Sequence, residues 1–178
     1  MKFLILGGAR HIGTHTATKL IDCGHDVVIA DDRVTSDLAD IPTKAVFYNG
    51  DFRDKSFLNY LMKKEFVDAV VYIADVSLAE NNSVKQLKHY ESNLCATKVL
   101  LDSMVDNGVD KIIFSTADEH ENESAVTLQH ENDETVPTIS WRDTKVAMEK
   151  MIVWAAGVYD LHYVSLHHFN AREAFMSV

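Results

Sequence analysis

A chain of 178 residues, 47% hydrophobic and 25% charged, is long enough to bury the core of a globular protein, and we expect one domain over residues 1–178. Its formal net charge of −10 argues against a nucleic-acid or anionic-membrane partner, because clustered lysine and arginine bind both. No apolar run reaches the roughly 18 residues of a membrane span, and no signal-peptide cleavage site follows Met1. The two cysteines, Cys23 and Cys95, fall in helical patterns as small core residues, so we expect a cytoplasmic protein.

Strand-like and helical patterns alternate along the chain. Apolar runs predict strands at Lys2–Leu6, Asp26–Ala30, Lys44–Tyr48, Asp68–Ile73, Lys111–Ser115 and His162–His167. Amphipathic patterns predict helices at His11–Cys23, Asp54–Lys64, Ser83–Asn107 and Ser140–Val158. Continuous Val/Ile/Leu strands separated by helices indicate an α/β protein with a doubly wound, mostly parallel six-stranded sheet, covered by helices on both faces.

A glycine turn joins the first strand to the first helix. The turn, Gly-Gly-Ala-Arg-His-Ile-Gly, begins at Gly7 and ends at Gly13, and Arg10 occupies the position of the middle glycine in a Gly-x-x-Gly-x-x-Gly pattern. Such a turn presents backbone N–H groups and a positive helix end to a pyrophosphate, so Gly7, Arg10, His11, Ile12 and Gly13 are candidate cofactor residues. The Arg10 guanidinium would either crowd the phosphates or fold over and bind them.

Acidic residues follow the second strand. Asp31 comes at the spacing where a carboxylate binds the ribose hydroxyls of NAD. Asp32 adds negative charge that repels the 2′-phosphate of NADP, whereas Arg33 would attract it. This pattern favours NAD.

Further candidates follow the next two strands. Asp51 and Phe52 form a turn that would close over the adenine, and Ala74 and Asp75 lie at the carboxyl edge of the sheet. Ligands of open α/β sheets bind at this edge. The alternative is that each of these residues belongs to an ordinary strand-end turn.

Six stretches carry a resemblance to a known family. They are Gly-Gly-Ala-Arg-His-Ile-Gly-Thr-His (7–15), Gly-His-Asp-Val-Val-Ile-Ala-Asp-Asp (24–32), Gly-Asp-Phe-Arg-Asp (50–54), Tyr-Glu-Ser-Asn-Leu-Cys-Ala-Thr (90–97), Gly-Val-Asp-Lys-Ile-Ile-Phe-Ser (108–115) and Tyr-Val-Ser-Leu-His-His-Phe-Asn (163–170). In collinear order they resemble the cofactor-binding half of the UDP-glucose 4-epimerases, in the extended short-chain dehydrogenase/reductase family. The resemblance implies a Rossmann fold that binds NAD, with Asn93 and Lys145 among the cofactor residues.

The catalytic positions depart from this family. Its members pair a Tyr-x-x-x-Lys motif with a Ser or Thr after the fifth strand, and the tyrosine moves a proton while NAD takes the hydride. Here Trp141 replaces the tyrosine, and Lys145 is retained. The indole N–H only donates hydrogen bonds and cannot act as a general base near neutral pH. The Ser/Thr position falls on Ala117, or on Thr116 or Ser115 if the register differs by one or two residues.

The substrate side departs as well. The family continues into a domain that holds the sugar nucleotide, and we expect that domain to be absent here. The carboxylates of the segment Asp118–Glu134 would repel a diphosphate.

The long helices predict a partner. In the resembling epimerases, the helices matching 83–107 and 140–158 form a dimer face. These helices carry more apolar positions than one sheet-facing stripe needs: Leu94, Val99, Leu101, Met104, Val105, Val146, Met148, Ile152 and Val153. We expect a homodimer through this face, although packing on the sheet is the simpler role for some of these residues.

The histidines do not predict a metal site. The adjacent His167 and His168 point to opposite faces of a strand, and His120 and His130 lie in the acidic segment. His11 and His15 share a helical face at a spacing that can hold a metal, but both overlie the cofactor turn. Surface and cofactor-side imidazoles are the better interpretation.

Two functions remain open. The first is a non-catalytic NAD(H)-binding or interaction protein derived from an epimerase, with Trp141 stacked over the nicotinamide and another protein as a partner. The second is an epimerase or dehydratase subunit that uses Thr116 and obtains its substrate domain from a partner chain. A scaffold that binds no ligand is the third and simplest alternative.

Overall fold

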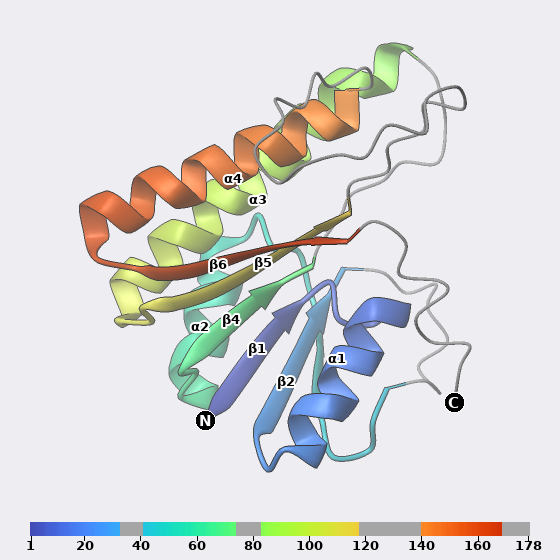
Figure 1. The fold of residues 1–178 in the computed structure, drawn as a ribbon, viewed down its shortest axis with the longest axis vertical. Coiled ribbons are helices and arrows are strands. Elements are labelled where there is room, and N and C mark those ends of the chain that lie inside the picture. The colour runs from blue at the N-terminus through green and yellow to red at the C-terminus, as the bar shows by residue number, and fades with distance from the viewer. Residues whose placement is uncertain (33–40, 74–82, 118–139, 169–178) are drawn as a thin grey trace.

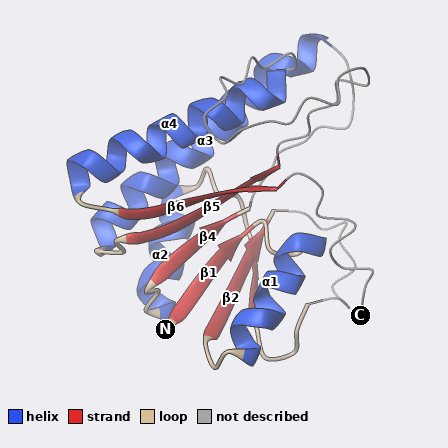
Figure 2. Cartoon of the chain, viewed as in Figure 1, coloured by secondary structure: helices blue, strands red, loops and turns tan. Residues whose placement is uncertain are grey.

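The computed structural model describes residues 1–32, 41–73, 83–117 and 140–168. Within these ranges, the side chains of residues 83–89, 117, 140–143 and 168 are not described. Six strands form one sheet: β1 (Lys2–Leu6), β2 (Asp26–Asp31), β3 (Val46–Asn49), β4 (Ala69–Tyr72), β5 (Lys111–Ala117) and β6 (His162–His168). The helices are α1 (His11–Asp22), α2 (Lys55–Glu65), α3 (Ser83–Asn107) and α4 (Ser140–Tyr159). Figure 2 separates these two kinds of element in the view of Figure 1.

The sheet has the strand order β3-β2-β1-β4-β5-β6, and every neighbouring pair is parallel. The order reverses between β1 and β4, which is the switch point of a doubly wound sheet. Helix α1 covers one face, while α2, α3 and α4 lie on the other (Figure 1). The predicted parallel α/β architecture is confirmed.

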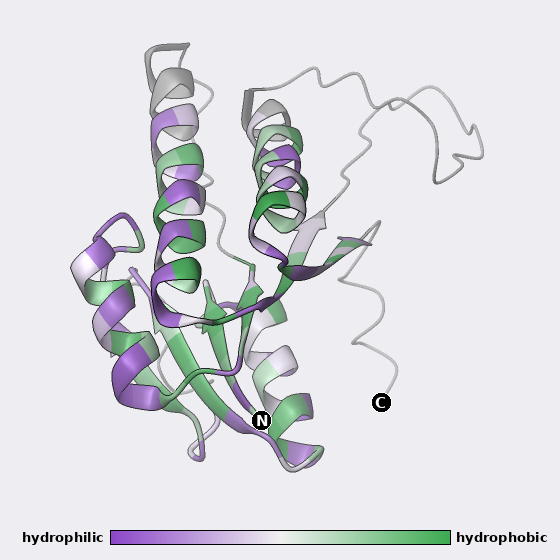
Figure 3. Cartoon of the chain, turned by 90° about the vertical axis from the view of Figure 1, so that its left-hand side faces the viewer, coloured by the Kyte–Doolittle hydropathy of each residue, from purple (hydrophilic) through white to green (hydrophobic). Residues whose placement is uncertain are grey.

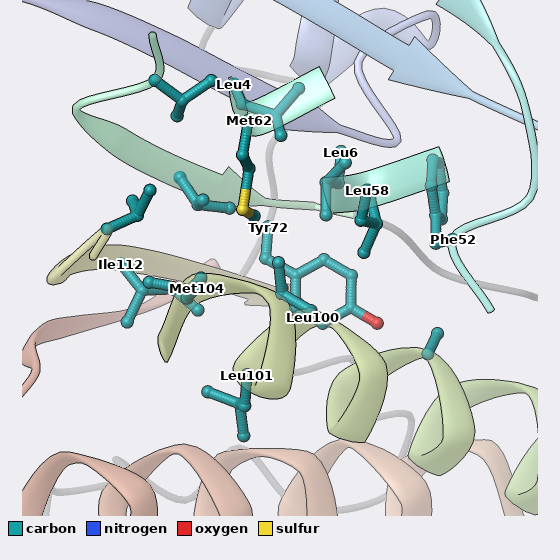
Figure 4. Close-up of a cluster of buried hydrophobic side chains, with 14 of the residues drawn as sticks. Leu4, Leu6, Phe52, Leu58, Met62, Tyr72, Leu100, Leu101, Met104 and Ile112 are labelled. Carbon is teal, nitrogen blue, oxygen red and sulfur yellow. The ribbon is translucent and has the colours of Figure 1, made fainter. Parts of the chain in front are cut away.

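The two faces of the sheet support two cores. Alternate residues of β1, β2 and β4, among them Ile5 and Ile29, pack with Ala17 of α1 in the smaller core. The opposite faces of these strands pack against α2, α3 and α4 in the larger core, where Tyr72, Leu100 and Met104 are almost fully buried. Figure 4 shows these side chains between the strands and the helices. The middle strands are correspondingly hydrophobic over most of their length (Figure 3).

Most element boundaries agree with the predicted ranges to within one or two residues. The strand predicted from Lys44 begins at Val46, because the Ala45 N–H donates to the Pro42 carbonyl (2.8 Å) and closes a turn there. Helix α2 begins at Lys55, since Asp54 is its N-cap and accepts the N–H groups of Ser56 and Phe57.

The prediction that the cysteines are core residues was wrong. Cys23 is exposed at the C-cap of α1, and Cys95 is exposed on α3. Hydrophobic periodicity places a residue on a helix, but a small residue at the border of the apolar stripe can lie on either side of it.

No helix of the described residues is long and apolar enough to cross a membrane.

Candidate functional site

The glycine turn lies between β1 and α1 at the carboxyl edge of the sheet. Gly7 adopts a positive φ of 77°, and its N–H donates to the Ala30 carbonyl of β2 (2.9 Å). A Cβ atom on Gly13 would lie 2.6 Å from the carbonyl carbon of Gly8, so only glycine allows this contact between turn and helix. The turn is therefore bonded to β2 at its start and packed against α1 at its end.

Arg10 is the N-cap of α1. Its backbone is extended (φ −104°, ψ 173°), so this position needs no glycine, and its exposed side chain makes no cap hydrogen bond. His11 and Ile12 begin the helix, with His11 exposed, and the His11 and His15 rings meet edge to face with centroids 4.6 Å apart. The helix start thus carries cationic and titratable side chains and no acidic residue in its first turn.

Asp31 connects the end of β2 to the turn. Its side chain is 3% exposed, and Oδ2 accepts the Ala9 N–H at 3.1 Å. Burial raises the pKa of Asp31, while the Ala9 hydrogen bond and then the charge of Arg10 oppose the rise. The turn and the carboxylate predicted to bind ribose therefore form one unit.

Asp32 adds a second carboxylate beside the first. Although the residue is exposed overall, desolvation of its carboxyl group, followed by the negative charges of Asp31 and Asp51, raises its pKa. A dianionic 2′-phosphate would meet these carboxylates, which is unfavourable.

Asp51 forms hydrogen bonds with Arg53, whereas the neighbouring Phe52 is buried in the core. The Asp51 carboxylate accepts hydrogen bonds from Nε and Nη2 of Arg53 at 2.7–3.0 Å, and these bonds lower the pKa of Asp51. Arg53 also donates to Ser92 Oγ of α3 at 3.5 Å. Phe52 is 5% exposed and belongs to the larger core, so any contact with a cofactor would be made by its backbone.

Asn93 and Lys145 are both buried on the helices behind the sheet. Asn93 Nδ2 donates to Thr144 Oγ1 at 3.0 Å, which joins α3 to α4 at the residue before Lys145. Lys145 is 7% exposed, and its Nζ lies 5.9 Å from the ring centroid of Phe114. Two residues farther along β5, Thr116 lies on the same face and is 5% exposed, while Ser115 is 7% exposed on the other face.

The described residues include only some of the predicted site. Ala74, Asp75, Arg33, His120, His130 and the acidic segment lie outside the described residues. Trp141 falls in the first turn of α4, and Ala117 ends β5 paired with His168, but their side chains are not among those described. His167 contacts Glu149 of α4 at 3.2 Å. Among the described residues, no three His, Cys, Asp or Glu side chains are grouped to hold a metal.

The sequence analysis did not predict three residues that contact the candidate site residues: Arg53, Ser92 and Thr144. The sequence does contain a signal for Arg53, because Asp51 two residues earlier can accept both its backbone and its side chain, as the structure shows. Thr144 stands next to Lys145, but its partner Asn93 lies 51 residues away along the chain.

Comparison with known proteins places these features in a family. Residues 3–172 match the model of the NAD dependent epimerase/dehydratase family. The UDP-glucose 4-epimerase of Lacticaseibacillus casei is 35% identical over 98% of this chain and 53% of its own length. A crystal structure of a UDP-glucose 4-epimerase has 38% identity and a TM-score of 0.87 over 96% of this chain and 52% of its own.

A further relative was solved with its cofactor. UDP-glucose 4-epimerase from Brucella ovis in complex with NAD has 28% identity and a TM-score of 0.85 over 95% of this chain and 52% of its own. The chain thus spans about half the length of the relatives that it matches. With a family match over nearly all its residues, the chain belongs to the NAD dependent epimerase/dehydratase family.

Proposed function

We propose that this chain is a cytoplasmic NAD(H)-binding or interaction protein, derived from an NAD-dependent epimerase, that does not catalyse epimerisation by itself. The observation that carries the proposal is the buried Asp31 carboxylate, tied to the glycine turn through the Ala9 N–H. Both groups lie at the edge where open α/β sheets bind nucleotides.

The described residues fit NAD. The close packing of Gly13 on Gly8 holds the start of α1 against the glycine turn, and backbone N–H groups at a helix start are a favourable environment for a pyrophosphate. Asp31 Oδ2 accepts the Ala9 N–H, and a carboxylate has further acceptor capacity for ribose hydroxyls. When bound, NAD supplies a hydride acceptor.

The residues at the catalytic positions of the family support the proposal that this chain does not catalyse epimerisation by itself. By the family resemblance, Trp141 stands where a tyrosine would move the proton, and an indole cannot replace it. Ala117 stands where a hydroxyl would assist. Lys145 remains, but by the resemblance it assists the tyrosine, and Trp141 replaces that tyrosine here.

Calorimetric titration with NAD⁺ and NADH tests the binding. We expect saturable binding by the wild-type protein and its loss in Asp31→Ala, with Asp26→Ala at the exposed start of the same strand as the matched control. Absence of wild-type binding at millimolar cofactor would contradict the proposal and favour the scaffold that binds no ligand.

An activity assay tests the chemistry. In an assay for interconversion of UDP-glucose and UDP-galactose with added NAD⁺, we expect no turnover by this chain alone. Turnover by the chain alone would contradict the proposal. In that case, the buried pair Thr116 and Lys145 would be the groups to substitute first.

A further inference from the structure

Arg10 has a side chain that the glycine turn does not use. Its carbonyl accepts the Thr14 N–H (2.8 Å) as the first hydrogen bond of α1, and the extended backbone holds the residue without strain. The guanidinium makes no cap hydrogen bond and is exposed. The position normally held by the middle glycine therefore accommodates an arginine without distortion of the turn.

The positive charge of Arg10 acts on the nearby carboxylate of Asp31. The preceding residue, Ala9, donates its N–H to Asp31 Oδ2, so Arg10 follows directly on the connection between turn and β2. The Arg10 charge is also one of the influences that lower the pKa of Asp31, against the larger effect of burial. Arg10 and the carboxylate expected to bind the ribose are therefore neighbours in the site.

Two sources of positive potential meet here in a protein of net charge −10. One is the N-terminus of the 12-residue helix α1, which has no acidic residue in its first turn. The other is the guanidinium, which is permanently charged and binds phosphate oxygens through paired N–H groups. The Brucella ovis relative, in which NAD is bound, gives independent reason to expect a diphosphate ligand.

On the basis of the NAD(H) binding proposed above, we infer that Arg10 binds the diphosphate of the dinucleotide. Asp31, Arg10 and the glycine turn lie together at this edge, so all three would bind the ADP-ribose portion of the ligand. Because NAD⁺, NADH and ADP-ribose share the diphosphate, loss of the guanidinium should weaken the binding of all three by a similar factor.

The test compares Arg10→Gln with Lys19→Gln, which removes the same charge from the exposed far end of α1. The dissociation constants of NAD⁺, NADH and ADP-ribose are measured for each protein. Arg10→Gln should weaken each about tenfold, as expected for one charge-assisted contact of about 1.4 kcal/mol. Its affinity should also depend less steeply on salt, whereas Lys19→Gln should match the wild type.

Three results would overturn the inference. These are unchanged affinity in Arg10→Gln, tighter binding in Arg10→Gly, and a loss in Arg10→Gln that is confined to one of the three ligands. Each of them leaves NAD(H) binding itself intact. If the wild-type protein binds none of the three ligands, both the inference and the proposed function fail, so the two failures are distinguishable.

Discussion

The single contact between Gly13 and Gly8 sets how closely α1 approaches the glycine turn. Replacing Gly13 with alanine would place a Cβ against backbone atoms that cannot rotate away, 2.6 Å from the Gly8 carbonyl carbon. We expect a loss of about 1–3 kcal/mol in the free energy of unfolding, as for other overpacked sites. Gly157→Ala is the control, because an added Cβ there meets nothing within 4 Å in α4 and should stabilise by about 0.5–1 kcal/mol. Urea unfolding measures both; equal stabilities of the two variants would contradict the prediction.

The burial of Asp31 makes stability depend on pH in a definite direction. Burial raises the pKa of Asp31, so the folded state takes up a proton at a higher pH than the unfolded state. Between the raised value and the ordinary value of about 3.9, the folded state binds more protons, and stability increases as the pH falls. We therefore expect the wild type to gain stability relative to Asp31→Asn when the pH is lowered from 7 to about 4.

Asp106 provides a control of opposite sign for this measurement. The hydrogen bond from Lys55 (2.8 Å) lowers the pKa of Asp106, so the stability it contributes is present above the ordinary value and is lost as the pH falls. The wild type should lose stability relative to Asp106→Asn as the pH falls below about 4, by a small amount because the pair is exposed. Thermal unfolding at several pH values gives both differences, and the same sign for both would show that the interpretation of Asp31 is wrong.

At the scale of elements, the hydrogen bond from Asn93 to Thr144 fastens α3 to α4 beside Lys145. Both side chains are buried (1% and 0% exposed), so removing one partner leaves a polar group without this bond in a dry environment. We expect Asn93→Ala and Thr144→Val each to reduce the free energy of unfolding by about 1–3 kcal/mol. In a double-mutant cycle, the combined variant should lose less than the sum of the two. Additive losses would mean that the two residues stabilise the protein separately.

The strands and helices were predictable because each has a strong period of its own. Helix α3 (Ser83–Asn107) and strand β1 have the predicted boundaries, whereas β3 begins late because a local hydrogen bond at Pro42 overrides its apolar pattern. Asp31 was predictable since it follows a buried strand at a known spacing. The Asn93–Thr144 contact was not, because the two residues are 51 positions apart in the sequence and meet only through the packing of α3 against α4.

For the whole molecule, we propose that two copies associate through the outward faces of α3 and α4. Four of the apolar residues expected there, Leu101, Met104, Met148 and Ile152, are buried in the chain's own larger core instead. Exposed apolar side chains nevertheless remain in the C-terminal halves of the helices: Val105, Val153, Trp154 and Val158. Trp154 is 65% exposed, which is costly for so large an apolar group unless another surface covers it.

The dimer is tested by sedimentation of two matched variants. Val153→Glu places a charge in the proposed contact, whereas Val46→Glu makes the same change on β3, at the opposite end of the sheet and with nearly equal exposure (44% and 45%). We expect the wild type and Val46→Glu to sediment as two copies of the 20.0 kDa chain, and Val153→Glu as one, because an unpaired charge at a buried contact is strongly unfavourable. A wild-type mass of one copy at micromolar concentration, or a dimer unaffected by Val153→Glu, would exclude this face.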